Sequence, residues 1–172
     1  MSRPAGSLAV TRCIVNDPVG NVTEGYFDAR GRCVMERDYT GRATPGLPVT
    51  PTLNRPAGKL RAGDPDYYET RWNWNSDSLC TLEISPGGQQ VQYIYESDFD
   101  KSAQARKRAD CRVVRELAAG GVDLNGDGTA DVTERVWRYE YDPRFGSDPA
   151  ASRLRSGVIA EVGVLDDPRL HD

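Results

Sequence analysis

The chain has 172 residues, of which 38% are hydrophobic and 28% are charged, and its net charge is −4. This acidic balance argues against a protein-wide nucleic-acid footprint, and no apolar run is long enough to span a bilayer. The N-terminus lacks a long apolar segment, so no signal peptide is expected within this chain.

The first part of the chain has the pattern of short strands separated by turn residues. Strands are predicted at residues 8–15, 22–28 and 33–39. Asp17-Pro18 favours a turn after the first strand, and Gly20 and Gly31 tolerate a positive φ in the two intervening turns. The three strands therefore predict consecutive β-hairpins.

The composition changes at residues 43–66, which are rich in proline and glycine. Proline lacks the N–H that a helix or a central strand requires, so this segment is predicted to be a long loop. Aromatic and polar residues then alternate, which predicts further strands at 67–75, 79–84 and 90–97, with a hairpin turn at 85–89.

Residues 100–119 fit two structures. Cys111, Val114 and Leu117 match helical spacing, whereas Cys111, Val113 and Leu117 match a strand. The composition favours a helix, so the pattern alone leaves both open. The β-branched and aromatic segment 132–142 is predicted to be a strand, and residues 157–165 have the composition of another.

The acidic segment between these regions, residues 123–134, has the residue types of a calcium loop. EF-hand-type loops place oxygen ligands at alternating positions, a glycine at the central bend and a bidentate carboxylate at the end. Gly128 occupies the bend, and the predicted ligands are Asp123, Asn125, Asp127, Thr129, Asp131 and Glu134. Gathering these carboxylates without a cation would cost repulsion. The alternative is an Asx-type polar turn whose charges stay in solvent.

The flanks of this loop do not match a helix-loop-helix hand. Gly120-Gly121 would break an entering helix, the exiting segment has a strand pattern, and Ala130 stands where a large apolar residue usually pairs with a second hand. We therefore expect one structural Ca²⁺ that clamps two strands, with a dissociation constant of roughly 10⁻⁴ to 10⁻³ M.

The four cysteines, Cys13, Cys33, Cys80 and Cys111, contain no CxxC pair, which disfavours a zinc site. Their spacing does not decide whether they pair, which would require an oxidising compartment. The single histidine, His171, lies next to the C-terminus, a poor place for a catalytic base.

Three segments carry a resemblance to a known family. "NDPVGNVTEGYFDARGRCVMERDYTGR" (16–42) resembles one RHS/YD repeat, in which an Asp-Pro-x-Gly turn precedes a strand ending in Tyr-Asp-x-x-Gly-Arg. "WNWNSDSLCTLEISPGGQQVQYIYESD" (72–98) and "TERVWRYEYDPRFG" (133–146) look like two more divergent repeats. The resemblance covers roughly residues 8–146.

The resemblance implies antiparallel β-hairpin repeats that form part of a hollow shell, with at most one short helix, and it favours a strand at 111–117. The implied organisation is a YD-type repeat at 8–42, a loop at 43–66, further hairpins at 67–146 and a divergent tail at 147–172. The implied partners are the remainder of an RHS-type shell or an encapsulated C-terminal domain. The family's self-cleavage motif is not matched, so no proteolysis is transferred.

The expected function is a non-enzymatic calcium-binding β-repeat scaffold segment of a large secreted or surface RHS-like protein. A few hairpins cannot close a shell, so their open sheet edges are expected to permit self-association. The alternative is a small EF-hand-type calcium-responsive protein. An enzyme is disfavoured, because the one dense carboxylate cluster is spaced for a cation.

Overall fold

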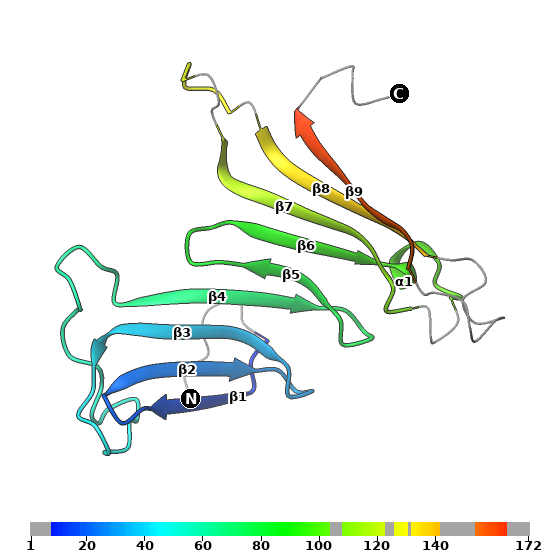
Figure 1. Cartoon of the computed structure of the whole chain (residues 1–172). Coiled ribbons are helices and arrows are strands. Elements are labelled where there is room, and N and C mark those ends of the chain that lie inside the picture. Colours follow the sequence, from blue (N-terminus) through cyan, green and yellow to red (C-terminus); the bar gives the residue numbers. More distant parts are fainter. Residues whose placement is uncertain (1–7, 104–107, 123–125, 131, 142–153, 165–172) are drawn as a thin grey trace. The chain divides into compact units, whose positions relative to one another are not determined.

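The computed structural model describes residues 8–103, 108–122, 126–130, 132–141 and 154–164. Within these residues the chain is mainly antiparallel β structure, and the single helix, α1, is the short segment Glu96–Phe99 (Figure 1). The predicted mainly β fold with hairpin connections is therefore confirmed. The chain divides into two compact units, Met1–Asn73 and Trp74–Asp172, which are described separately.

The first unit is an antiparallel sheet with the order β1-β2-β3-β4. Its strands are β1 (Thr11–Asn16), β2 (Asn21–Phe27), β3 (Cys33–Arg42) and β4 (Tyr67–Trp74), which reaches the unit boundary. The first strand begins at Thr11, later than the predicted residue 8. Ala9, just before it, is only 5% exposed and packs into the apolar cluster with Tyr26 and Met35. That cluster is small, so much of this sheet is held by polar contacts.

Four hairpin turns, two in each unit, share one geometry; they begin at Asp17, Asp28, Asn75 and Ser85. In each of them the first residue donates its N–H to the C=O of the fifth residue and accepts a hydrogen bond from the N–H of the fourth, at 2.9 to 3.1 Å. The fourth residue has a positive φ in every case: 88° at Gly20, 76° at Gly31, 61° at Ser78 and 83° at Gly88. This is a three-residue loop closed by a left-handed residue, which matches the right-handed twist of paired strands.

A side-chain acceptor strengthens three of these turns. The Oδ1 atoms of Asp17, Asp28 and Asn75 each accept hydrogen bonds from the N–H groups two and four residues later, at 2.8 to 3.0 Å. These Asx turns give the backbone donors of the loop a partner within the chain and so favour the turn conformation. The sequence-predicted turns at 16–21 and 29–32 are confirmed.

Residues 43–66 form a loop, as predicted, with one isolated bridge between Arg42 and Ala57. Two asparagines fix it: the Nδ2 groups of Asn16 and Asn54 both donate to the carbonyl oxygens of Thr44 and Leu47, at 2.9 to 3.0 Å. The loop is thus attached to the end of β1, which explains how a segment without strands remains ordered.

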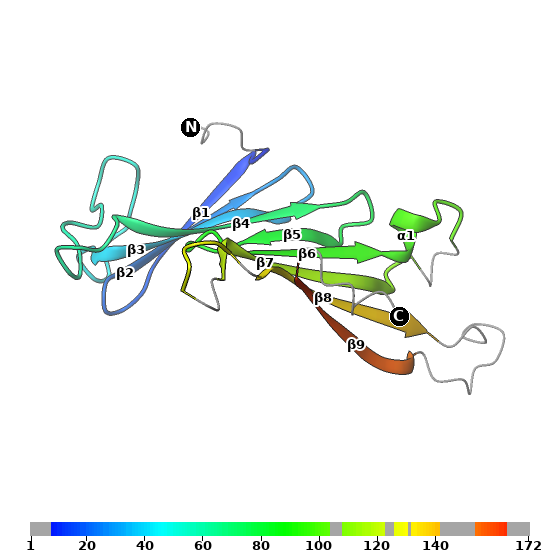
Figure 2. The same cartoon turned by 90° about the horizontal axis from the view of Figure 1, so that it is seen from above.

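The second unit is an antiparallel sheet with the order β5-β6-β7-β8-β9. Its strands are β5 (Cys80–Ile84), β6 (Gln90–Tyr95), β7 (Cys111–Val122), β8 (Val132–Tyr141) and β9 (Leu154–Val164). In Figure 2 the strands β7, β8 and β9 lie side by side and curve together. The strand expected at 157–165 exists but begins earlier, within the segment predicted to be a divergent tail.

Pairing on both sides decides the ambiguous segment in favour of a strand. Val113 pairs with Ile94 of β6 and with Arg138 of β8, and Val114 pairs with Tyr93 and Trp137. The helix propensity of this segment is outweighed because β6 and β8 both provide backbone hydrogen-bond partners for it. Among the described residues, no helix combines the length and the apolar composition needed to cross a membrane.

Two glycine substitutions should separate conformational strain from steric clash. Gly31→Ala should lower the free energy of unfolding by about 1 kcal/mol, because an L-residue is disfavoured at positive φ and the added Cβ meets no neighbour. Gly20→Ala should cost clearly more, since its Cβ would also collide with the carbonyl oxygen of Ala43. Urea unfolding followed by circular dichroism measures both, and equal losses would contradict the close approach of the loop.

Acid should weaken the first two turns. Hydrogen bonds from Asn21 and Arg32 lower the pKa values of Asp17 and Asp28, respectively. Because the folded pKa lies below the unfolded value of about 3.9, the stabilisation is complete above about pH 4 and is lost as pH falls through the folded pKa. Asp28→Asn keeps the turn acceptor but cannot titrate, so its melting temperature should fall less steeply between about pH 4 and pH 2. Identical slopes for both proteins would contradict this role.

Candidate metal site and the polar groups around it

The predicted calcium loop connects β7 to β8. Its described part comprises Gly126–Ala130 and residues 132–134, the latter already in β8. Three of the six predicted ligands, Asp123, Asn125 and Asp131, lie outside the described residues. Both flanks are strands and not the two helices of an EF-hand. The strand after the loop was expected from the sequence pattern, whereas for the segment before it the pattern left helix and strand open and only the resemblance favoured a strand.

The described tip of the loop is a tight polar turn. Gly126 and Gly128 have φ values of 81° and 85°, so Gly128 provides the bend expected at this position. The N–H of Thr129 donates to Oδ1 of Asp127 at 2.8 Å, and both residues are exposed. This Asx-type contact is compatible with a cation loop and with the alternative of a solvated turn.

Glu134, the predicted bidentate ligand, lies in β8 and is engaged by Arg115 of β7. Nε and Nη2 of Arg115 lie 2.8 Å and 2.5 Å from Oε2 of Glu134. The two side chains are 38% and 26% exposed, so solvent weakens the pair without removing it. Calcium binding by Glu134 would therefore compete with Arg115, a partner that the ligand pattern does not reveal.

The pairing of β7 with β8 is irregular close to the acidic loop. Leu117 pairs with Glu134, whereas the next pair joins Val122 to Val132. Residues 118–121 thus bulge out of β7 opposite Thr133, and the bulge contains Gly120 and Gly121, whose φ values are 79° and 77°. The glycines expected to stop a helix instead form this bulge, which sets the outer arm of the hairpin apart from the ladder.

Within the described residues, no group of three or more His, Cys, Asp or Glu side chains is placed to hold a metal ion. Because half of the predicted ligands fall outside those residues, the calcium site stays a prediction. His171 also lies outside them. Of the predicted ligands, the structure describes Asp127, Thr129 and Glu134.

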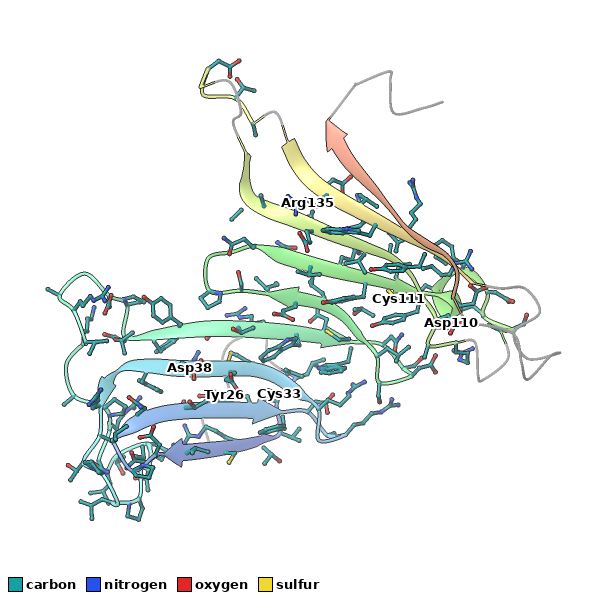
Figure 3. All side chains as sticks on the ribbon, viewed as in Figure 1. Tyr26, Cys33, Asp38, Asp110, Cys111 and Arg135 are labelled. Atoms are coloured by element: carbon teal, nitrogen blue, oxygen red, sulfur yellow. The ribbon has the colours of Figure 1, made fainter. Side chains whose placement is uncertain are left out.

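A second polar cluster, in the first unit, was not found from the sequence. Glu24 is 5% exposed and accepts a hydrogen bond from the Tyr26 hydroxyl at 2.6 Å. Nη1 of Arg12 lies 3.8 Å from the other carboxylate oxygen of Glu24. Figure 3 labels Tyr26 on β2 within this sheet. A carboxylate this deeply buried is costly unless paired, so these partners are required for stability.

Arg37 extends the cluster across β3 to β4. Its guanidinium carbon lies 5.4 Å from the Tyr26 ring centroid and 4.4 Å from that of Tyr67. Nε of Arg37 donates to Glu69 at 2.7 Å, and Nε of Arg71 donates to the other oxygen of Glu69 at 2.6 Å. The described acidic groups of this cluster are neutralised by arginine, which suits a structural role. The signal missed in the sequence was the alternation of Val22, Glu24 and Tyr26 on one face of β2.

The four cysteines are free thiols. Three of them begin strands or follow turns and place Sγ 3.5 to 3.6 Å from the carbonyl oxygen two residues later: Cys33, Cys80 and Cys111. Cys13 is exposed. The recurrence of one thiol contact in both units is a second feature, besides the turns, that the two units share.

Comparison with known proteins adds no family assignment: no family model matches the chain, and no curated protein matches it. The resemblance to RHS/YD repeats therefore rests on the sequence segments themselves.

Glu24→Ala should destabilise the first unit by about 3 kcal/mol, because it leaves the buried Tyr26 hydroxyl and Arg12 without their partner. Asp38→Ala is the matched control: Asp38 is exposed and accepts from the Thr23 hydroxyl at 2.7 Å, so its removal should cost less than about 1 kcal/mol. Urea unfolding of the two variants tests the ranking, and a Glu24 variant as stable as the control would rule out a structural role for the cluster.

Proposed function

We propose that the chain is a non-enzymatic β-repeat scaffold segment, stabilised by one calcium ion, of a large secreted or surface protein of the RHS type. In that setting its partners are the remainder of a shell or a domain enclosed by it. The proposal concerns a mechanical and structural role, in which paired strands provide a surface and no residue performs chemistry.

The observation that carries the proposal is the repeated turn. Four turns, two in each unit, have the same backbone hydrogen bonds and the same left-handed fourth residue, although their sequences differ: DPVGN, DARGR, NSDSL and SPGGQ. Repeat architectures reuse one supersecondary unit whose neighbours cover each other. A turn geometry kept through such different sequences is what a chain of divergent hairpin repeats requires.

The calcium part of the proposal is supported by the position of the acidic loop. It joins two neighbouring strands of a sheet, where a cation would bring carboxylates from both arms together. Gly128 has the bend that such loops need, and Asp127 and Thr129 lie exposed at the tip. With no second hand to couple to, a cation here would fix the end of the hairpin and would not act as a sensor.

Calcium titration by calorimetry, with far-UV circular dichroism, tests this role. The wild-type chain should bind one Ca²⁺ with a dissociation constant of roughly 10⁻⁴ to 10⁻³ M and keep a β-type spectrum. Asp127→Ala should abolish binding, because it removes a central carboxylate ligand. Absence of binding up to about 10 mM calcium would refute the metal site, because this concentration exceeds the dissociation constants of the weakest extracellular calcium sites.

Arg115→Gln should strengthen calcium binding, because the substitution frees Glu134 from its ion pair. The calcium affinity should rise by up to about fivefold, which corresponds to the free energy of a partly exposed ion pair. Arg112→Gln is the matched control: Arg112 is on the same strand and equally exposed, but it pairs with Glu96 at 3.3 Å, away from the loop. Equal effects of the two substitutions would show that general charge, and not Glu134, controls the affinity.

A further inference from the structure

The loop between β7 and β8 contains the one Asp-Gly step of the sequence, Asp127-Gly128. Such a step is chemically reactive, because glycine has no Cβ to shield its amide nitrogen from the carboxyl group of the preceding residue. Both residues are exposed at the described tip of the loop. A change in the covalent path of the main chain can therefore be accommodated there without disturbing a packed core.

Glycine on both sides gives the main chain around Asp127 wide conformational freedom. Gly126 and Gly128 have φ values of 81° and 85°, and a Cβ built at either position would meet no atom within 4 Å. Glycine moves between positive and negative φ at little cost. The tip can thus reach the compact arrangement in which the Gly128 nitrogen meets the carboxyl carbon of Asp127.

A hydrogen bond already folds the Asp127 side chain over the peptide bond that follows it. The N–H of Thr129 donates to Oδ1 of Asp127 at 2.8 Å. The ring closed by this bond contains Cγ, Cβ, Cα and C of Asp127 and the nitrogen of Gly128. A succinimide joins these same atoms, so the contact keeps the attacking nitrogen and the attacked carbon within one tight turn. The donated hydrogen bond also polarises the carboxyl group, which favours attack at Cγ.

Asp100 provides a comparison within the same chain. It is exposed, and its Oδ1 accepts a hydrogen bond from the N–H of Ser102, again two residues later and at 2.8 Å. The Ser102 hydroxyl donates to the same oxygen at 2.6 Å. The following residue is Lys101, whose side chain stands beside the nitrogen that would attack. Asp127 and Asp100 thus share exposure and the side-chain turn, and they differ in the residue that supplies the nitrogen.

We propose that Asp127 is a site of spontaneous covalent modification, at which aspartate isomerises to isoaspartate through a succinimide. The nitrogen of Gly128 bonds to Cγ of Asp127, and the carboxyl hydroxyl leaves as water with the amide proton. Water then opens the ring. Cleavage of the bond between nitrogen and Cγ restores aspartate, whereas cleavage of the bond between nitrogen and the main-chain carbon yields isoaspartate. One water is released and one is consumed, so no cofactor or oxidant is required.

The product has a different loop geometry. The main chain gains one carbon at residue 127, and the carboxylate is attached one carbon closer to it. In the calcium loop this change would displace a central ligand, so the loop would lose calcium binding as the protein ages. That consequence rests on the proposed function, whereas the isomerisation depends only on the Asp-Gly step and its turn. A chain that binds no calcium would still isomerise.

Incubation of the full chain with a chelator, at neutral pH and body temperature, tests the site. Electron-transfer mass spectrometry of its peptides distinguishes isoaspartate from aspartate by the fragments of the altered main chain. Isoaspartate should accumulate at Asp127 several-fold faster than at Asp100. Isomerisation leaves the peptide mass unchanged, which separates it from deamidation of Asn125. Equal rates at the two aspartates, or no isoaspartate at Asp127, would overturn the proposal.

Three substitutions test the attacking nitrogen. Gly128→Ala should slow the reaction several-fold because the new Cβ crowds that nitrogen. Gly126→Ala is the matched control, with a similar positive φ and equally open surroundings, but its nitrogen precedes Asp127 and the rate should be unchanged. Lys101→Gly should speed isomerisation at Asp100 several-fold, since the side-chain turn is already present there. Far-UV circular dichroism checks that each variant is folded. Equal slowing by the two alanine variants, or an unchanged rate at Asp100, would contradict the mechanism.

Discussion

Four hairpins of the structure depend on a left-handed residue at the fourth position of the turn. With three residues in the loop, the first and fifth residues become a bonded pair, which fixes the register of the β1–β2 hairpin from Asn16↔Val22 to Thr11↔Phe27. The β2–β3 hairpin shifts its register between Tyr26 and Phe27, directly behind its turn. Because side chains alternate with a period of two, that register decides which residues face the buried side. In β2 it places Val22, Glu24 and Tyr26 on the buried face, where Glu24 meets the Tyr26 hydroxyl and Arg12.

The buried face of the first unit is stabilised by a few apolar residues and by paired charges. The apolar cluster comprises Ala9, Tyr26 and Met35, while Glu24 and Asp28 are almost as buried. In a low-dielectric interior each unpaired charge would be costly, whereas a satisfied network confines the sheet to one arrangement. A chain with few hydrophobic residues thus obtains order from charge pairing across neighbouring strands.

Local signals predicted the fold well, because turns and alternation depend on nearby residues. The strands, the hairpin turns and the long loop could be placed from the sequence to within a few residues. The segment after Cys111 could not, since its composition favours a helix and only pairing with β6 and β8 makes it a strand. The sequence also did not predict the contacts between Arg115 and Glu134 and between Arg37 and Glu69. These residues are close only because of the strand register. For the candidate metal site the sequence supplies the ligand types and the bend at Gly128, but not the competing arginine.

The bulge at residues 118–121 has a consequence for motion. Residues 118–121 have no paired position in β8 and include two glycines with positive φ, so this stretch should open locally at a lower free energy than the regular ladder. Its amide hydrogens should exchange through local fluctuations, while those of the ladder from Val113 to Leu117 should exchange only when the sheet itself opens. The bulge can therefore shift while the paired strands before it keep their register.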